Sequence, residues 1–377
     1  MAENPLSPRS VVISRPRSAE LLAETPEASD GATATVALDA FALSDSDLET
    51  FARSDPDVRA PIRYPRIPGR LATGTITLSQ RLPEEPRILP FSQNPQVSTI
   101  PPGSRVLLKP WLPCGECLPC SRGEEHSCTT PRLRGRDIDG YARNLVSLSA
   151  DNLLRVPAQF PSTALLFADE VGVALEALSR LELRKGDRLL LLGVTTTTLV
   201  AMLLAKARGI ETYLADVNVA KLELGRSMGA DQVINPLNGY VAEEIEWYSG
   251  GALADGALLC HRGATMISLA VDAVRPGTAL MIVDGYEGRL EDGSGALVGT
   301  SEEIVARCGR KGLQLLSPRP WWPRATEVLQ ELSSLPPTTD LDRLVSNRLE
   351  LESIPLILPM MAEKPGDYLK VVCELGS

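Results

Sequence analysis

Four cysteines crowd into fifteen residues of this chain and carry its firmest chemical signal. They are Cys114, Cys117, Cys120 and Cys128. Four thiolates at this spacing suit one soft divalent cation in a tetrahedral site, and zinc is the usual occupant. A disulfide arrangement is the alternative, but no signal-peptide pattern is present and three more cysteines lie far apart in the sequence. We therefore expect one structural zinc per chain in a lobe at 112–130. With four cysteine ligands the ion has no open position for substrate.

The composition narrows the class of protein. The chain has 377 residues, of which 44% are hydrophobic and 23% are charged, as in a globular protein with two domains. Its net charge of −10 argues against a nucleic-acid partner, since binding phosphates requires concentrated positive charge. The longest uncharged run, 189–205, is short for a membrane span and is better explained as a buried strand, a turn and a helix. We expect a cytoplasmic protein without a membrane partner.

The hydrophobic pattern divides the chain into three parts. Residues 1–30 are rich in Pro, Ser, Arg and Glu and predict a poorly ordered leader with one edge strand at 11–13. Short apolar runs with Gly and Pro turns predict a β-rich domain over 31–160, which carries the cysteine lobe. Alternating apolar strands and helices over 161–312 predict an α/β domain with a doubly wound parallel sheet. The mixed pattern of 313–377 indicates a return to the first domain.

A threonine-rich turn follows the apolar strand at 188–192. Its sequence is Gly193-Val-Thr195-Thr196-Thr-Thr198, whereas a dinucleotide-binding turn has glycine at the first, third and sixth of these positions. A side chain at Thr195 would place atoms where the pyrophosphate normally sits. Asp216, 23 positions after Gly193, has the right distance to accept from a ribose 2′-hydroxyl.

Structural explanations compete with nucleotide binding at this turn. The threonines would cap the free N–H groups of the following helix, and Asp216 would be only a cap or turn residue. Alternatively, the hydroxyls of Thr195 and Thr196, together with the helix dipole, could bind an anion in a position different from that of the pyrophosphate.

The order of these parts resembles the medium-chain dehydrogenase/reductase family, which includes the zinc-type alcohol, polyol and threonine dehydrogenases. The resemblance covers about residues 33–373. It is carried by Pro68-Gly69, the cysteine lobe, Asp139-Gly140-Tyr141-Ala142, Lys185-Gly186-Asp187, Ala205-Lys206-Ala207-Arg208-Gly209, Lys221 to Asp231 and Arg275-Pro276-Gly277. It implies a split GroES-like domain around a Rossmann nucleotide-binding domain, and a homo-oligomer. It further implies NAD(H)-dependent hydride transfer on a small-molecule alcohol, polyol or carbonyl compound, with a catalytic zinc that polarises the substrate oxygen.

Two expected ligands of that catalytic zinc are replaced in this chain. Ser44 stands where the family has a cysteine shortly before an Asp-Leu pair, here Asp47-Leu48. Arg70 stands where the family has the histidine of a Gly-His-Glu motif, and Glu170 alone matches a ligand position. The whole chain has two histidines, which cannot make up the deficit. We predict no catalytic zinc, and we take Ser44, Asp47, Arg70 and Glu170 as residues that line the pocket.

Arg70 would then lie near the position of the missing metal, within reach of Asp47, Glu49 or Glu170. It could neutralise carboxylates left behind by the metal, because a buried acid is otherwise costly, or polarise a substrate carbonyl as a fixed cation.

Three functions stay open at this point. The first is a zinc-independent dehydrogenase of this family. A non-catalytic relative, acting as a scaffold, binding protein or partner subunit, fits the alteration of two sites beside a complete cysteine lobe. A zinc-free quinone or enoyl reductase fits the missing metal, although that branch generally lacks the lobe.

Overall fold

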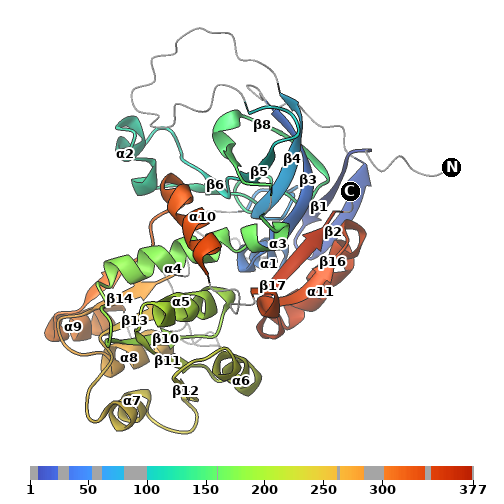
Figure 1. The fold of residues 1–377 in the computed structure, drawn as a ribbon. Helices are drawn as coiled ribbons and strands as arrows, with labels where there is room; N and C mark the ends of the chain where they lie inside the picture. Colours follow the sequence, from blue (N-terminus) through green and yellow to red (C-terminus); the bar gives the residue numbers. More distant parts are fainter. Residues whose placement is uncertain are drawn as a thin grey trace. The chain divides into compact units, whose positions relative to one another are not determined.

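Two compact units make up the chain (Figure 1). The computed structural model describes residues 7–23, 34–52, 62–79, 100–158, 160–260, 264–283, 301–335 and 341–375. The first unit runs to Asp169 and resumes at Asp340, and the second spans Glu170–Thr339. The sequence pattern indicated a return to the first unit at 313. The structure places it near 340, because the strand β15 (Gln314–Leu316) and the helix α10 (Ala325–Ser334) belong to the second unit.

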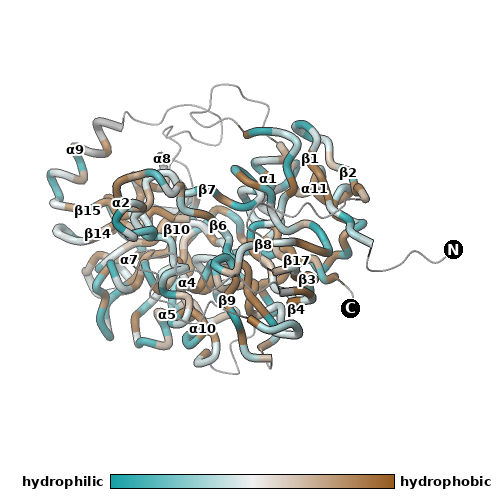
Figure 2. The backbone as a smooth tube through the Cα atoms, turned by 90° about the horizontal axis from the view of Figure 1, so that it is seen from above, coloured by the Kyte–Doolittle hydropathy of each residue, from teal (hydrophilic) through white to brown (hydrophobic). Residues whose placement is uncertain are grey.

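The first unit is a β-rich fold around one long strand, β3 (Ala34–Leu43). This strand pairs antiparallel with β4 (Leu71–Ser79), β8 (Leu145–Leu148) and the C-terminal strand β17 (Lys370–Glu374). The sheet is extended by β5 (Arg105–Leu108), β9 (Leu153–Arg155) and β16 (Val345–Leu349). Figure 2 shows hydrophobic residues along β3, β4 and β17. Burial of this apolar face is what brings the end of the chain back to its beginning.

An antiparallel hairpin, β1 (Arg9–Arg15) and β2 (Ser18–Ala23), lies within the segment that the sequence pattern assigned to a poorly ordered leader. Val11 and Ile13 are fully buried, and the backbone N–H of Val11 donates to the carbonyl of Ala142 at 2.8 Å. The pattern indicated one edge strand here. The partner strand β2 is not apparent from the sequence, because its residues are half-buried or exposed and no buried apolar face marks it. The helices of this unit include α1 (Asp45–Ala52), α3 (Ser162–Leu165) and α11 (Ile354–Glu363).

The second unit is a parallel sheet in the strand order β12-β11-β10-β13-β14-β15. Its further strands are β10 (Arg188–Leu192), β11 (Glu211–Ala215), β12 (Gln232–Ile234), β13 (Gly256–Leu259) and β14 (Ala279–Ile282). The first strand in sequence, β10, lies between the second and the fourth, so the strand order reverses beside it. In open sheets of this kind, ligands bind at the carboxyl ends of the strands where the order reverses. The turn at Gly193 is therefore at the expected place for a nucleotide.

Helices pack against the parallel sheet. They are α4 (Ala168–Arg180), α5 (Thr196–Ala207), α6 (Val219–Ser227), α7 (Val241–Ser249), α8 (Ala264–Ala273) and α9 (Ser301–Lys311). Residues of α7, α8 and α9 share one apolar core with β10, β11 and β13. The strand β10 is completely buried from Leu189 to Leu192, as expected for a strand covered on both faces.

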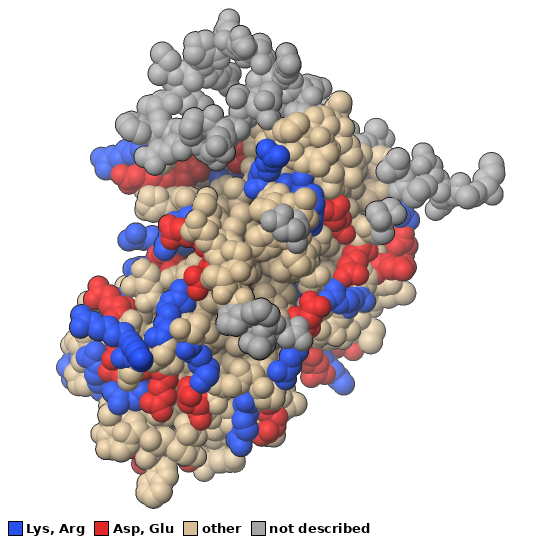
Figure 3. Space-filling model, viewed as in Figure 1, with Lys and Arg blue, Asp and Glu red and all other residues tan. Residues whose placement is uncertain are grey.

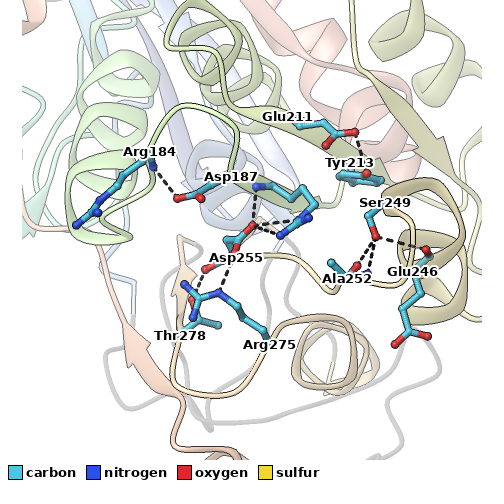
Figure 4. Close-up of polar contacts among 11 residues, drawn as sticks. Arg184, Asp187, Glu211, Tyr213, Glu246, Ser249, Ala252, Asp255, Arg275 and Thr278 are labelled. Carbon is cyan, nitrogen blue, oxygen red and sulfur yellow. Dashed lines mark hydrogen bonds and ion pairs between the residues drawn. The ribbon is translucent and has the colours of Figure 1, made fainter.

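A buried carboxylate fastens the amino ends of two neighbouring strands (Figure 4). Asp255, which directly precedes β13, accepts hydrogen bonds from the backbone N–H of Arg188 at 2.9 Å and from the guanidinium groups of Arg188 and Arg275. Burial raises the pKa of Asp255, but these hydrogen bonds and the arginine charges outweigh burial and leave the pKa below its ordinary value. This network lies at the edge of the sheet opposite to Gly193, and it fixes the register of β10 and β13.

The charged side chains of the second unit are mixed in sign. On the face drawn in Figure 3, Lys and Arg side chains alternate with Asp and Glu. Within the described ranges, no helix is long and apolar enough to cross a membrane.

We expect Gly135→Ala to destabilise the first unit more than Gly103→Ala does. Both glycines have positive φ, +84° and +83°, so both variants incur the left-handed penalty of about 1–2 kcal/mol. At Gly135 a Cβ would also lie 2.3 Å from the Oδ1 atom of the buried Asp47, whereas nothing lies within 4 Å at Gly103. The clash should add about 2 kcal/mol to the loss of unfolding free energy in urea. Equal losses in the two variants would contradict the close approach.

Candidate functional site

The four cysteines converge in a small lobe of the first unit. The lobe leaves the sheet through the paired strands β6 (Trp111–Leu112) and β7 (Arg132–Leu133) and contains the short helix α2 (Leu118–Ser121). The four sulfur atoms all lie within 4.8 Å of one another. Two of the distances are 3.9 Å, from Cys114 to Cys120, and 4.0 Å, from Cys117 to Cys128. A tetrahedral zinc with Zn–S bonds of 2.3 Å requires sulfur atoms about 3.8 Å apart, so the lobe fits this ion.

The backbone of the lobe favours thiolates. The N–H of Cys117 donates to the sulfur of Cys114, and the N–H of Cys114 donates to the sulfur of Cys128, both at 3.3 Å. A hydrogen bond from Thr130, followed by backbone N–H groups, lowers the pKa of Cys114 to about 6. Burial and the neighbouring thiols raise the pKa of Cys120 to about 12 in the absence of a cation. A divalent ion would offset the repulsion among four thiolates, since coordinating thiols are deprotonated.

The serine and the aspartate predicted to line the catalytic pocket cap a helix. Ser44 directly precedes α1, and both its N–H and its hydroxyl donate to the Oδ2 atom of Asp47 at 2.8 Å. The other carboxylate oxygen of Asp47 accepts from the N–H of Gly69 at 2.7 Å. Asp47 is fully buried, and burial raises its pKa to about 6 against the opposing effect of these hydrogen bonds and of the Arg70 charge. Both side chains are therefore engaged in holding the start of α1 against Gly69.

Arg70 has a carboxylate partner that the sequence analysis did not name. Its Nε lies 3.1 Å from the Oδ2 atom of Asp169, whereas Asp47, Glu49 and Glu170 were the expected partners. Asp47 is still close enough for the Arg70 charge to lower its pKa. Asp169 directly precedes Glu170 in the chain. Its position next to an expected partner was the one sequence signal that could have indicated Asp169 as the partner of Arg70. Glu170 itself is half-buried near the start of α4, as the first residue of the second unit.

The threonine turn caps the helix α5, as one of the two interpretations predicted. The N–H of Thr195 donates to the hydroxyl of Thr198 at 2.9 Å, and the N–H of Thr198 donates to the hydroxyl of Thr195 at 3.3 Å. The Thr198 hydroxyl also lies 2.7 Å from the carbonyl of Gly193. Thr196 is buried, and Gly193 has a φ of +84°, which requires glycine. Two N–H groups near the expected pyrophosphate position are thus bonded within the loop.

Asp216 connects the turn after β10 with the turn after β11 through two hydrogen bonds. Its Oδ2 accepts from the N–H of Val194 at 2.6 Å, and its Oδ1 accepts from the N–H of Asn218 at 2.8 Å. The residue is 8% exposed at the end of β11. Each carboxylate oxygen can accept a further hydrogen bond, so these contacts are compatible with a ribose hydroxyl. The structure therefore brings Gly193, Thr195, Thr196 and Asp216 together at the carboxyl edge of the sheet.

Two family models match this chain. The alcohol dehydrogenase GroES-like domain matches residues 30–158, and the zinc-binding dehydrogenase family matches 197–306, which together exceed half of the chain. An uncharacterized zinc-type alcohol dehydrogenase-like protein of Haemophilus influenzae is 28% identical over 61% of this chain and 62% of its own. An alcohol dehydrogenase of Geobacillus stearothermophilus is 29% identical over 59% of this chain and 61% of its own. The chain thus spans about three fifths of the length of these curated relatives.

Solved structures share the fold over nearly the whole chain. Galactitol-1-phosphate dehydrogenase from Escherichia coli is 20% identical with a TM-score of 0.80, and covers 97% of this chain and 99% of its own. A short chain alcohol dehydrogenase (rspB) of E. coli CFT073, solved with NADH, is 18% identical with a TM-score of 0.77 and the same coverage. A β-rich unit with a cysteine lobe, joined to a doubly wound unit, defines a two-domain protein of the dehydrogenase type. This chain belongs to the medium-chain dehydrogenase/reductase family.

We expect the purified protein to hold about one zinc per chain, and Cys128→Ser to lose it. Elemental analysis of the metal-to-protein ratio measures the loss, and a lower thermal unfolding temperature should accompany it, because the binding energy of the ion contributes to folding. Cys373→Ala is the matched control, since Cys373 is buried in the same unit outside the lobe. An unchanged zinc content in Cys128→Ser, or an equal loss in the control, would contradict the assignment.

Asp47 should make the first unit less stable as the pH rises. Because its pKa is raised to about 6 in the folded state, the folded protein holds the proton more tightly than the unfolded chain. The resulting stabilisation is complete below about pH 4 and is lost as the pH rises through 6, by about 3 kcal/mol in all. Urea unfolding between pH 4 and 7 should show this loss in wild type relative to Asp47→Asn. The exposed Asp45 on the same turn provides the control variant Asp45→Asn, which should keep the wild-type pH dependence. The same pH dependence in wild type and Asp47→Asn would contradict the expectation.

Proposed function

We propose that this chain catalyses nicotinamide-dependent hydride transfer on a small alcohol, polyol or carbonyl compound, without a zinc at the usual catalytic position. The observation that carries the proposal is the position of Asp216 beside the Gly193 turn. A buried carboxylate at the end of the second strand of a doubly wound sheet, beside the turn after the first strand, is the arrangement that binds the ribose of a dinucleotide.

The absence of a catalytic zinc is supported by what the candidate ligands do. Ser44 is bonded to Asp47 within the cap of α1, and Arg70 is ion-paired with Asp169. Within the ranges that the structure describes, the four cysteines are the one group of side chains arranged to hold a metal ion. A guanidinium at the second ligand position would also repel a divalent cation. We accordingly propose one structural zinc per chain in the cysteine lobe.

A nicotinamide dinucleotide would supply the hydride acceptor or donor. In this chain, Gly193 would let the backbone turn beneath the phosphates, Asp216 would accept from the ribose, and Thr195 and Thr196 would offer hydroxyls at the start of α5. Asp216 would also repel a 2′-phosphate, which favours NAD(H) over NADP(H). Arg70 supplies a positive charge near the emptied ligand position. Its ion pair with Asp169 supports neutralisation as its main role.

A second candidate, a non-catalytic relative, is favoured by the capping box of α5. Thr195 and Thr198 use each other's N–H and hydroxyl groups, so the turn is complete without a ligand. In this case the chain would act as a scaffold, binding protein or partner subunit. For both candidates we propose a cytoplasmic homo-oligomer, by analogy with the family.

The decisive measurement is calorimetric titration of the metal-quantified protein with NAD, NADH, NADP and NADPH. We expect micromolar binding that is tighter for the NAD pair, and Thr195→Gly should tighten it further because the β-branched side chain leaves the pyrophosphate position. Asp216→Asn should reduce the preference for NADH over NADPH. The control is Thr197→Gly, because Thr197 lies outside the capping box and outside the glycine positions of the fingerprint. No heat and no thermal shift at millimolar cofactor would exclude the dehydrogenase and favour the non-catalytic relative.

A further inference from the structure

We propose that a groove between the helices α4 and α10 binds a small zwitterion with an aliphatic body, of the class of the aliphatic α-amino acids (Figure 1). The groove has a volume of about 520 Å³, which lies within the range of small-molecule sites, about 300–1,000 Å³. Its lining residues all belong to the second unit. Binding at this groove does not depend on the proposed dehydrogenase function.

The groove reaches the amino edge of the parallel sheet. It is lined there by Leu183, before β10, and by Arg208 and Ile210, just before β11. The turn at Gly193 and the side chain of Asp216 lie at the opposite edge, where β10 and β11 end. A ligand in the groove is therefore separate from a dinucleotide bound at that turn.

Four aliphatic side chains form the apolar part of the groove. They are Leu175, Leu178, Leu183 and Ile210. Leu178 and Ile210 are buried, whereas Leu175 and Leu183 are half-buried and keep apolar surface in contact with water. No aromatic side chain is among the described residues that line the groove. An aliphatic ligand would cover the remaining surface of the two half-buried leucines, which favours binding.

A guanidinium–carboxylate pair lines the same groove. The Nη2 of Arg208 donates to the Oε1 of Glu331 at 2.8 Å, and its Nη1 donates to the carbonyl of Leu204 at 2.9 Å. These two bonds use two of the five N–H donors of a guanidinium and one of the two oxygens of a carboxylate. The side chains are 36% and 23% exposed, so the pair is held in place and is still accessible to a ligand.

The other arginine of the groove is engaged more fully. Arg324 donates from Nε and Nη2 to Glu327, at 3.0 and 2.7 Å, and from Nη1 to the buried Glu176 at 3.0 Å. All three of its nitrogens have a carboxylate partner, and two negative charges balance its one positive charge. The anchor for a ligand is therefore the pair of Arg208 and Glu331.

The zero net charge of this pair selects a zwitterion. A carboxylate that approaches Arg208 is repelled by Glu331, and an ammonium that approaches Glu331 is repelled by Arg208. A ligand that carries both groups on one carbon satisfies both residues, because its carboxylate accepts from Arg208 while its ammonium donates to Glu331. Each of the four charges then has opposite charges as neighbours, and the aliphatic body lies against the leucines.

The test is calorimetric titration of the purified full chain with L-leucine. We expect a dissociation constant below about 1 mM. Isocaproate, which is leucine without the ammonium, and isoamylamine, which is leucine without the carboxylate, should each bind at least about tenfold more weakly because one partner is lost. Glycine keeps both charges but lacks the aliphatic body, and it should also bind at least about tenfold more weakly.

Variants place the ligand in the groove. Arg208→Gln and Glu331→Gln should each weaken leucine binding by about tenfold or more, and Arg208→Lys should weaken it less because the charge remains. The matched controls are Arg226→Gln and Glu223→Gln, which remove an exposed ion pair of 3.9 Å on α6, outside the groove, and should leave binding unchanged. Thermal unfolding of each variant verifies that it is folded.

Four outcomes would overturn the proposal. They are no binding of leucine, equal binding of isocaproate or isoamylamine, leucine binding that survives both Arg208→Gln and Glu331→Gln, and an equal loss in the α6 controls. Leucine binding that survives those variants would place the amino acid elsewhere, for instance at the catalytic pocket. Because no dinucleotide is present in this titration, a failure of leucine binding leaves the dehydrogenase function untouched, and silence toward NAD(H) leaves the groove untouched.

Discussion

The first unit depends on one buried carboxylate. Asp47 has no access to solvent, and an ionised group in that position must be compensated by hydrogen bonds. The start of α1 supplies two of these through Ser44, and the N–H of Gly69 supplies another. Gly135 can approach the same oxygen only because it lacks a side chain. Three segments that are distant in sequence are therefore placed by the requirement to satisfy a single charge.

The contacts that hold the first unit together are independent of those that hold the cysteine lobe. Ser44, which we propose to stand at the family position of the first zinc ligand, directly precedes α1 and is bonded to Asp47, and Arg70, at the proposed second position, is a cation with its own partner, Asp169. Neither change disturbs the cysteine lobe, whose paired strands and N–H to sulfur bonds are local to 111–133. The binding energy of a structural metal stabilises the folded lobe, and this stabilisation does not depend on which residues line the pocket. The lobe can therefore stay complete while the pocket changes.

Local patterns predicted the fold well, and long-range contacts limited the rest. The cysteine spacing and the alternation of strands and helices predicted the lobe and the doubly wound sheet, because both are determined by neighbouring residues. The cap made by Thr195 and Thr198 is local as well. The partner of Arg70 could not be predicted, since which carboxylate approaches is decided by tertiary packing. The pattern after 313 does not reveal that the chain stays in the second unit until near 340, because β15 is a short strand with two exposed residues and one half-buried residue.

The energetics of the threonine turn show what decides between the two candidate functions. A helix cap contributes about 1 kcal/mol to stability. Binding of a dinucleotide with a micromolar dissociation constant has a favourable free energy of about 8 kcal/mol. Loss of the capping box is therefore too small a cost to exclude the cofactor. Asp216 does not exclude it either, because its oxygens keep acceptor capacity. The remaining obstacle is steric. The Cβ and the branched atoms of Thr195 stand where glycine lets the backbone approach the pyrophosphate. Under the proposed dehydrogenase function, cofactor binding therefore requires room for the pyrophosphate beside the side chain of Thr195.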